Sequence, residues 1–275
     1  TMHIESISAR VSPSLRRPGF QATVESAFAE AVNLTTTQGA ALALVSRRVG
    51  NGPFNAVVSQ PQALTLLHPG ATVRGDGQWL WLGDGWRLAL APAAAWNPQP
   101  DYAHLARRPQ IVARNLDRLR RHLPLAAPAA SLAAQPLAQN ALDGRGATAL
   151  MQARAGELTQ SLDAAYRQSD LGQVVHHAGR LAGLGPGLTP AGDDWLAGWL
   201  VGLRAAAAIG AAPPPLPLDA VGRAVVDSAR PRTSRLSLAF LQAAADGAVA
   251  ETWHALLSAL PDGDPALTRA AAAEI

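Results

Sequence analysis

The chain of 275 residues contains no cysteine and no lysine. The lack of cysteine excludes disulfide bonds, thiolate nucleophiles and thiolate-bound zinc. The lack of lysine excludes Schiff-base chemistry and a Walker-type phosphate loop, which uses a lysine. All 23 basic residues are therefore arginines, which raise the pI to about 10.4 although the formal net charge is only +3. This excess of arginine does not by itself predict nucleic-acid binding, which needs basic residues gathered in a recognisable module.

Long apolar runs are also missing. The longest, from Trp195 to Ile209, is interrupted by two glycines and an arginine, and a membrane span needs roughly 20 apolar residues. The segment from Thr1 to Arg17 has no apolar core of a signal peptide. We therefore expect a cytoplasmic protein that does not bind membranes. Because the sequence ends within a helical pattern, we also expect its C-terminus to be incomplete.

Up to about residue 100, short apolar runs alternate with turn-forming residues. This pattern is typical of strands linked by hairpins, and the Asp-Gly pairs within Gly75–Gly77 and Gly83–Gly85 favour tight turns. We predict one helix, Val24–Val32, followed by strands at Ala41–Val45, Ala56–Ser59, Ala63–Leu67, Gln78–Leu82 and Trp86–Leu90.

After Asp101 the apolar residues recur at helical spacing. The first helical stretch is basic and amphipathic. We predict helices at Tyr102–Leu123 (interrupted by Pro109), Thr148–Gln168, Leu171–Ala182, Pro190–Ile209, Asp219–Ala229, Thr233–Asp246, Ala248–Leu260 and Pro265 to the end. The chain is thus α+β, with an antiparallel β-rich domain (sheet or small barrel, residues 1–100) and an all-helical domain (residues 101–275).

One stretch combines special backbone residues with polar groups: Gly183-Leu-Gly-Pro-Gly-Leu-Thr-Pro-Ala-Gly-Asp-Asp194. Thr189 is a suitable N-cap, and Pro190 suits the first position of the helix that follows. The caps do not explain the alternating glycines, which allow positive φ or close approach of a ligand. We therefore predict that Gly183, Gly185 and Gly187 bind a ligand, while a purely structural turn is the alternative.

The two adjacent carboxylates begin the helix, where its dipole favours negative charge. Because they would repel an anion at the loop, one must point away and orient the loop, or the pair must hold Mg²⁺. We predict Asp193, Asp194 and Thr189 as catalytic residues. We expect no resident cofactor and no other metal, and Mg²⁺ at the two aspartates is the alternative.

A second polar cluster lies in Arg230-Pro-Arg-Thr-Ser-Arg-Leu-Ser237. Hydroxyl and guanidinium groups at a helix start bind phosphate or carboxylate, so we predict that Arg232, Thr233, Ser234 and Ser237 contact a ligand. The alternative is an ordinary N-cap followed by solvated arginines.

Two further groups have simpler explanations. Gly50-Asn51-Gly52-Pro53 suits a turn between strands, and Asn51 and Gly52 are ligand candidates only if their loop faces the helical part. His177 lies on the polar face of its helix, so we expect it to be solvated, whereas His176 shares a face with Gly183.

The glycine-rich motif, followed by Trp-Leu-Ala-Gly198, resembles the signature of the bacterial AllH-type family. Gly50–Phe54, and Thr233–Ser237 with the downstream Ala-Ala-Asp-Gly247, resemble two further stretches of that family, so the likeness runs from about Asn33 to Leu260. Two features depart from the family: Ala191 replaces the usual serine, and a further C-terminal glycine motif is missing.

The resemblance implies a subunit associated with oxamate carbamoyltransferase in anaerobic allantoin degradation, a branch of purine catabolism. Such a transferase exchanges oxalurate and phosphate with oxamate and carbamoyl phosphate. It implies a small anionic substrate and other protein subunits as partners, with no nucleic acid. The glycine loop would bind phosphate. Two alternatives stay open: a non-catalytic anion-binding or scaffold subunit of a larger acyl-transfer complex, and a Mg-dependent hydrolase that uses Asp193 and Asp194.

Overall fold

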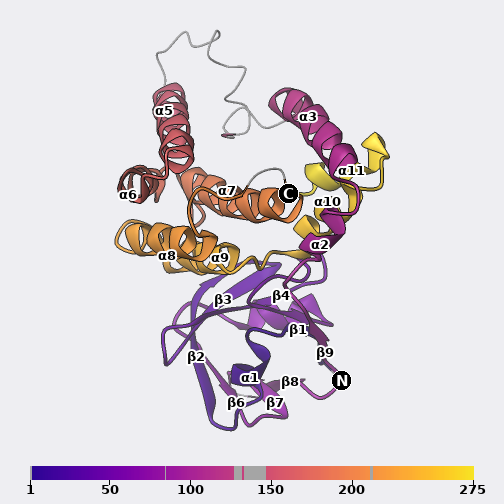
Figure 1. Cartoon of the computed structure of the whole chain (residues 1–275). Coiled ribbons are helices and arrows are strands. Elements are labelled where there is room, and N and C mark those ends of the chain that lie inside the picture. The colour runs from indigo at the N-terminus through magenta and orange to yellow at the C-terminus, as the bar shows by residue number, and fades with distance from the viewer. Residues whose placement is uncertain (1, 84, 127–131, 133–146, 211–212) are drawn as a thin grey trace. The chain divides into compact units, whose positions relative to one another are not determined.

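The computed structural model describes residues 2–83, 85–126, 132, 147–210 and 213–275 (Figure 1). The chain forms two compact units. One contains Thr1–Gln99 with Ala248–Glu251, and the other contains Pro100–Gly247 with Thr252–Ile275. Each unit is described by itself below.

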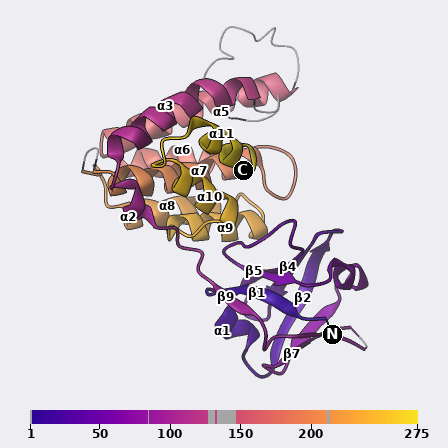
Figure 2. The ribbon, with the colours of Figure 1, turned by 90° about the vertical axis from the view of Figure 1, so that its right-hand side faces the viewer.

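The first unit is built on one nine-stranded sheet with the order β8-β7-β6-β2-β3-β4-β5-β1-β9. Most neighbours are antiparallel, whereas β4 with β5 and β1 with β9 are parallel. The sheet curls (Figure 2), and an isolated bridge joins His3, just before β1, to Ala89 of β8. The strands are β1 (Ile4–Ser8), β2 (Phe20–Ala27), β3 (Ala31–Thr36), β4 (Ala41–Val45), β5 (Asn55–Val58), β6 (Thr72–Gly75), β7 (Trp79–Leu82), β8 (Trp86–Ala89) and β9 (Ala94–Trp96).

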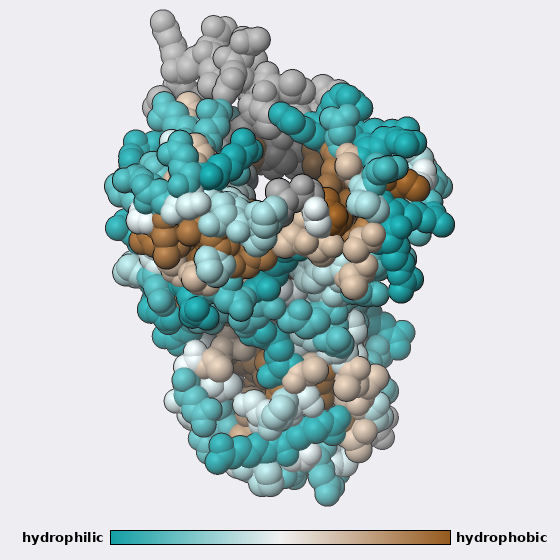
Figure 3. Space-filling model, in the orientation of Figure 1, coloured by the Kyte–Doolittle hydropathy of each residue, from teal (hydrophilic) through white to brown (hydrophobic). Residues whose placement is uncertain are grey.

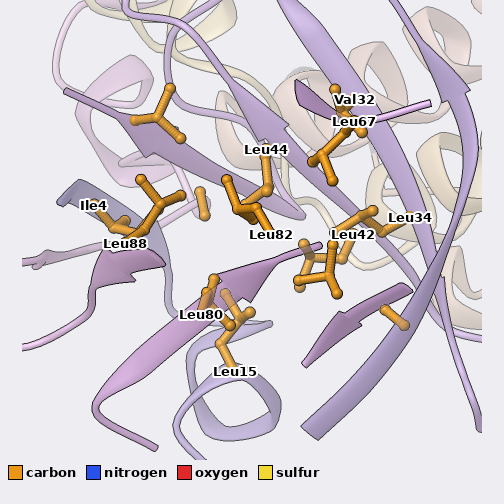
Figure 4. Packing of buried hydrophobic residues seen from close by; sticks show 14 of the residues in the cluster. Ile4, Leu15, Val32, Leu34, Leu42, Leu44, Leu67, Leu80, Leu82 and Leu88 are labelled. Atoms are coloured by element: carbon orange, nitrogen blue, oxygen red, sulfur yellow. The ribbon is translucent and has the colours of Figure 1, made fainter. Parts of the chain in front are cut away.

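The concave side of this sheet holds a single hydrophobic core. In β2 the buried Phe20, Ala22 and Val24 alternate with exposed residues, as a strand with one buried face requires. Leucines and other aliphatic side chains from most strands meet there (Figure 4), together with Leu15 of the short helix α1 (Ser12–Leu15). The predicted α+β class, with a β-rich part that is a sheet or small barrel, is confirmed.

Two predicted elements of this unit are wrong. Val24–Val32 is not a helix, because it spans the end of β2, a turn and the start of β3, which pair in an antiparallel ladder. Ala63–Leu67 is not a strand, because it lies largely in the 3₁₀ helix η1 (Pro61–Leu66), whose first-turn proline favours helical backbone.

The predicted turns of this unit have different outcomes. The Gly75–Gly77 turn is confirmed, and the Asp76 carboxylate accepts the N–H groups of Gln78 (2.8 Å) and Trp79 (2.7 Å). The turn at Gly83–Gly85 includes Asp84, which lies outside the described residues. The Gly50–Pro53 stretch lies between strands, as predicted, and because β4 and β5 run parallel the loop that contains it crosses over from one strand to the other.

The second unit is helical, as predicted, and most helix ends lie within three residues of the predicted ends. Helix α6 packs against α5 and α8, α9 packs against α7 and α8, and α3 packs against α11. None of the described helices is long and apolar enough to cross a bilayer. The helices are α2 (Tyr102–Leu105), α3 (Pro109–Ala126), α5 (Ala147–Arg167), α6 (Leu171–Leu181), α7 (Ala191–Ala208), α8 (Leu218–Ala229), α9 (Arg235–Ala245), α10 (Glu251–Ala259) and α11 (Pro265–Ala273).

Candidate functional site

Two loops of the helical unit meet at the glycine-rich motif. Residues 182–190 connect α6 to α7, and residues 230–234 connect α8 to α9. Gly183 has a φ of +74°, and a Cβ on it would lie 2.2 Å from the carbonyl oxygen of Arg232. Only glycine fits a position that combines left-handed backbone with so close a neighbour. The first glycine of the motif is therefore required for packing one loop on the other.

Asp193 joins these loops through its side chain. It lies in the first turn of α7 and is 2% exposed. One carboxylate oxygen accepts the N–H of Gly183 at 2.9 Å, and the other accepts the hydroxyl of Thr233. A buried carboxylate is tolerated when such donors replace its water. Asp193 and Thr233, both predicted as site residues, thus position the two loops.

The serines of the second cluster also bind the glycine loop. The hydroxyls of Ser234 and Ser237 donate to the carbonyl oxygen of Leu188, at 2.6 and 3.0 Å. The Ser234 hydroxyl oxygen also accepts the N–H of Ser237 at 3.0 Å, which makes it the N-cap of α9. These hydroxyls donate within the protein and fix the path of the loop.

The predicted start of α7 is wrong by one residue. Pro190, not Thr189, is the N-cap residue, and the helix begins at Ala191. The N–H of Gly192 donates to Leu184, and those of Asp193 and Asp194 donate to Pro190. Carbonyl oxygens of the loop therefore accept most of the backbone N–H groups in the first turn of α7. Thr189 is an exposed loop residue.

The middle of the glycine loop differs, because its amides have no hydrogen-bond partner within the described part of the chain. The N–H groups of Gly185, Gly187, Leu188 and Thr189 donate to no residue that the structure describes. Gly185 and Gly187 have φ of +124° and +95°, whereas the residue between them does not have positive φ. Backbone that alternates in this way can form a concave nest of N–H groups that binds anions. A Cβ on Gly187 would meet no atom within 4 Å, so the space beside it is open.

Two charged side chains accompany this loop. Arg232 is exposed and makes no ion pair with any described residue, and its Nε would lie 3.5 Å from a Cβ at Gly179. Asp194 is also exposed, yet partial burial of its carboxyl group and, to a smaller extent, the charge of the neighbouring Asp193 together raise its pKa to about 6. The two adjacent aspartates therefore differ: one is fixed by hydrogen bonds, and the other can exchange a proton near neutral pH.

His177 differs from its prediction. It is half-buried, and its Nδ1 is buried with no hydrogen-bond partner among the described residues. Burial lowers its pKa, and His176 and Arg180 add to the effect. His176 is exposed, with its ring edge-to-face on that of His177 at 5.1 Å. Nowhere in the described ranges do three or more potential metal ligands gather.

Asn51 and Gly52 lie in the other unit, and their contacts are with residues of that unit. The Asn51 amide donates to Glu251 at 2.7 Å and accepts the hydroxyl of Ser6 at 2.6 Å. The Asn51 carbonyl oxygen accepts the N–H of Glu251 at 3.0 Å. Gly52 is buried, and a Cβ on it would lie 2.6 Å from the Asn55 amide. These contacts hold residues 248–251 in the first unit, and neither Ser6 nor Glu251 was predicted from the sequence.

Comparison with known families gives two matches. The AllH family N-terminal domain matches residues 3–95, and the oxamate carbamoyltransferase subunit AllH matches residues 181–275. The chain belongs to the AllH family. The C-terminal match of AllH begins at the last residue of α6 and contains both loops of the candidate site. No curated protein and no solved structure matches the chain. The AllH description names a subunit, so it implies a carbamoyltransferase complex with other protein chains.

Proposed function

We propose that this AllH chain binds the small anionic substrate of carbamoyl transfer, carbamoyl phosphate or its phosphate product, at residues 183–189. The observation that supports the proposal is the set of amide N–H groups at Gly185, Gly187, Leu188 and Thr189, which have no described acceptor. Such groups recognise phosphate oxygens without a lysine. The proposal places the chain in oxamate carbamoyltransferase, in cytoplasmic allantoin degradation.

Arg232 supplies the positive charge. A guanidinium group can donate two parallel hydrogen bonds to a phosphate, and Arg232 makes no competing ion pair with the described chain. Thr233, Ser234 and Ser237 act by holding the loop in shape, because their hydroxyls donate to Asp193 and Leu188. The exposed hydroxyl of Thr189 is an additional donor for the substrate.

Asp194 is the proton acceptor in this proposal. The amide nitrogen of oxamate attacks the carbamoyl carbon, so that a C–N bond forms and the C–O bond to phosphate breaks. The nitrogen loses a proton, which Asp194 accepts because its pKa of about 6 suits exchange near neutral pH. The loop amides and Arg232 stabilise the charge on the departing phosphate.

A thermal-shift titration of the full chain tests the anion site. Phosphate, carbamoyl phosphate, oxamate and Mg²⁺ are added singly and in pairs, and a ligand at 100 times its dissociation constant stabilises the fold by about 2.7 kcal/mol. We expect carbamoyl phosphate to raise the melting temperature of the wild type. The rise should shrink in Gly187→Ala and Arg232→Gln and persist in Arg223→Gln, which removes an exposed arginine elsewhere.

The other outcomes separate the alternatives. If no ligand shifts the melting temperature, the stand-alone anion site is wrong and a scaffold role is favoured. If stabilisation and turnover both require Mg²⁺ and are lost in Asp193→Asn, the Mg-dependent hydrolase is favoured.

A further inference from the structure

The most strongly charged surface of the chain lies on α3, away from the two loops in sequence. Between residues 107 and 121 the chain has six arginines and one aspartate, a formal charge of +5. The whole chain carries +3, so the remaining residues carry −2. Figures 1 and 2 show α3 at the periphery of the helical unit, and Figure 3 shows hydrophilic side chains over it. The arginines are Arg107, Arg108, Arg114, Arg118, Arg120 and Arg121.

All six arginines are exposed, and one of them, Arg118, donates a hydrogen bond to the side chain of Asn115 at 3.3 Å. The opposite side of α3 buries Val112 and Leu119 in the core it shares with α10. Within the described chain, Asp117 is the only carboxylate in an ion pair with one of them, and it pairs with Arg121 at 2.7 Å. Leu116, 42% exposed, lies on the same helix at the edge of the buried side, one turn before Arg120.

The charges do not stabilise α3 in the free chain. Arg114 and Arg118 are four residues apart and Arg118 and Arg121 are three apart, so each pair repels across the helix surface. Arg107 and Arg108 precede the helix, at the end where its dipole is positive and disfavours cations. An anionic surface laid on α3 would relieve both effects.

We propose that the exposed face of α3 docks an acidic surface of another protein subunit of the complex. Arginine is enriched in protein interfaces and among the residues that contribute most to binding. The helix has no Phe, Tyr or Trp on which a nucleobase could stack, and its one aromatic ring is that of His122. The family description of a subunit supplies the class of partner. This docking face is separate from the anion site, so either can be wrong without the other.

The test measures association of the full chain with the co-expressed other subunits of the oxamate carbamoyltransferase complex, at about 50 and 200 mM salt. We expect Arg114→Glu/Arg118→Glu to raise the dissociation constant at least about tenfold and to flatten its salt dependence. The control, Arg48→Glu/Arg223→Glu, reverses two exposed arginines elsewhere and should change it less than about twofold. Circular dichroism checks folding, and Arg114→Gln/Arg118→Gln replaces the charge reversal if that variant does not fold.

Three results would overturn the proposal. The first is a dissociation constant for the subunits that stays within about twofold of wild type in both α3 variants. The others are binding at physiological salt to a labelled DNA duplex or to vesicles containing phosphatidylglycerol, lost in the α3 variants while subunit association persists. The shift with carbamoyl phosphate should be unchanged in the α3 variants, so the docking face and the anion site are tested separately.

Discussion

The chain contains two glycine-rich loops that resemble each other in sequence but differ in what surrounds them. In the first unit, the loop from residue 46 to residue 54 is packed against other residues of that unit, and we call it the closed loop. Gly50 has a φ of +77°, and a Cβ on it would overlap the Glu251 side chain. Asn51 bonds to Glu251 and Ser6, and Gly52 is packed against Asn55.

The loop from residue 182 to residue 190 is packed against other residues only near its ends, and we call it the open loop. Gly183 is pressed against Arg232 and is held by Asp193, whereas Gly187 has open space around it. Between these ends, the N–H groups of Gly185, Gly187, Leu188 and Thr189 have no described acceptor. Glycines in a loop thus indicate special backbone geometry. Backbone N–H groups without a described acceptor are what distinguish a candidate site from a structural turn.

The largest change in the free energy of unfolding should come from adding one methyl group at Gly183, where the 182–190 loop is packed against Arg232. Gly183→Ala should destabilise the helical unit by roughly 3 kcal/mol or more, because the Cβ meets backbone and φ is positive. Gly187→Ala should cost only about 1 kcal/mol, from backbone strain alone. Urea unfolding of both variants measures the difference. Equal losses would show that the packed end of the loop at Gly183 and its middle at Gly187 are not distinct.

Substitution of Asp193 should give the second-largest loss in the free energy of unfolding. Asp193→Asn should lower the free energy of unfolding by about 2–3 kcal/mol, because the new amide cannot accept from both Gly183 and Thr233. Thr233→Val, which removes one of the two bonds, should cost about 1 kcal/mol. Hydrogen exchange at the ends of α6 and α9 locates the loss. Wild-type stability in Asp193→Asn would contradict the positioning role.

In the closed loop, Asn51→Ala should destabilise the first unit by about 1–2 kcal/mol, because it leaves Glu251 and Ser6 without their partner. It should leave the response to carbamoyl phosphate unchanged. A melting curve with and without carbamoyl phosphate checks both statements. Loss of the ligand response would mean that the closed loop also contributes to binding.

Asp194→Asn should have the smallest effect on stability, with the opposite sign. Because the folded-state pKa is raised to about 6, the folded protein binds this proton more tightly, and wild-type stability falls as pH rises from about 4 to 6. The variant should therefore be more stable by roughly 0.5–1 kcal/mol at pH 8, with little difference at pH 4, since water screens an exposed carboxyl. Turnover in the assembled complex should fall. A pH-independent difference would contradict the raised pKa.

Backbone conformation could be predicted from the sequence where it depends on residues that are close together in the chain. Alternating glycines predicted positive φ at Gly183, Gly185 and Gly187, and helical spacing predicted the helices of the second unit that the structure describes. The false helix at Val24–Val32 shows the limit, because good helix formers were overridden by strand pairing with distant neighbours.

The site was predictable as a set of residues but not as a set of roles. Adjacent aspartates on a helix must point differently, but only the fold decides that Asp193 is buried and Asp194 exposed. The hydroxyls of Ser234 and Ser237 suited a ligand in kind, yet the path of the loop directs them to Leu188. The contact of Asn51 with Glu251 spans 200 residues and had no local signal.

The most direct test of the anion site is a two-dimensional ¹H–¹⁵N NMR titration of the full chain with carbamoyl phosphate and, separately, with phosphate. We expect saturable shifts of the amide signals of Gly185, Gly187, Leu188 and Thr189, while those of Gly50 and Gly52 stay in place. Absence of shifts at the open loop, or shifts centred on the closed loop instead, would contradict it.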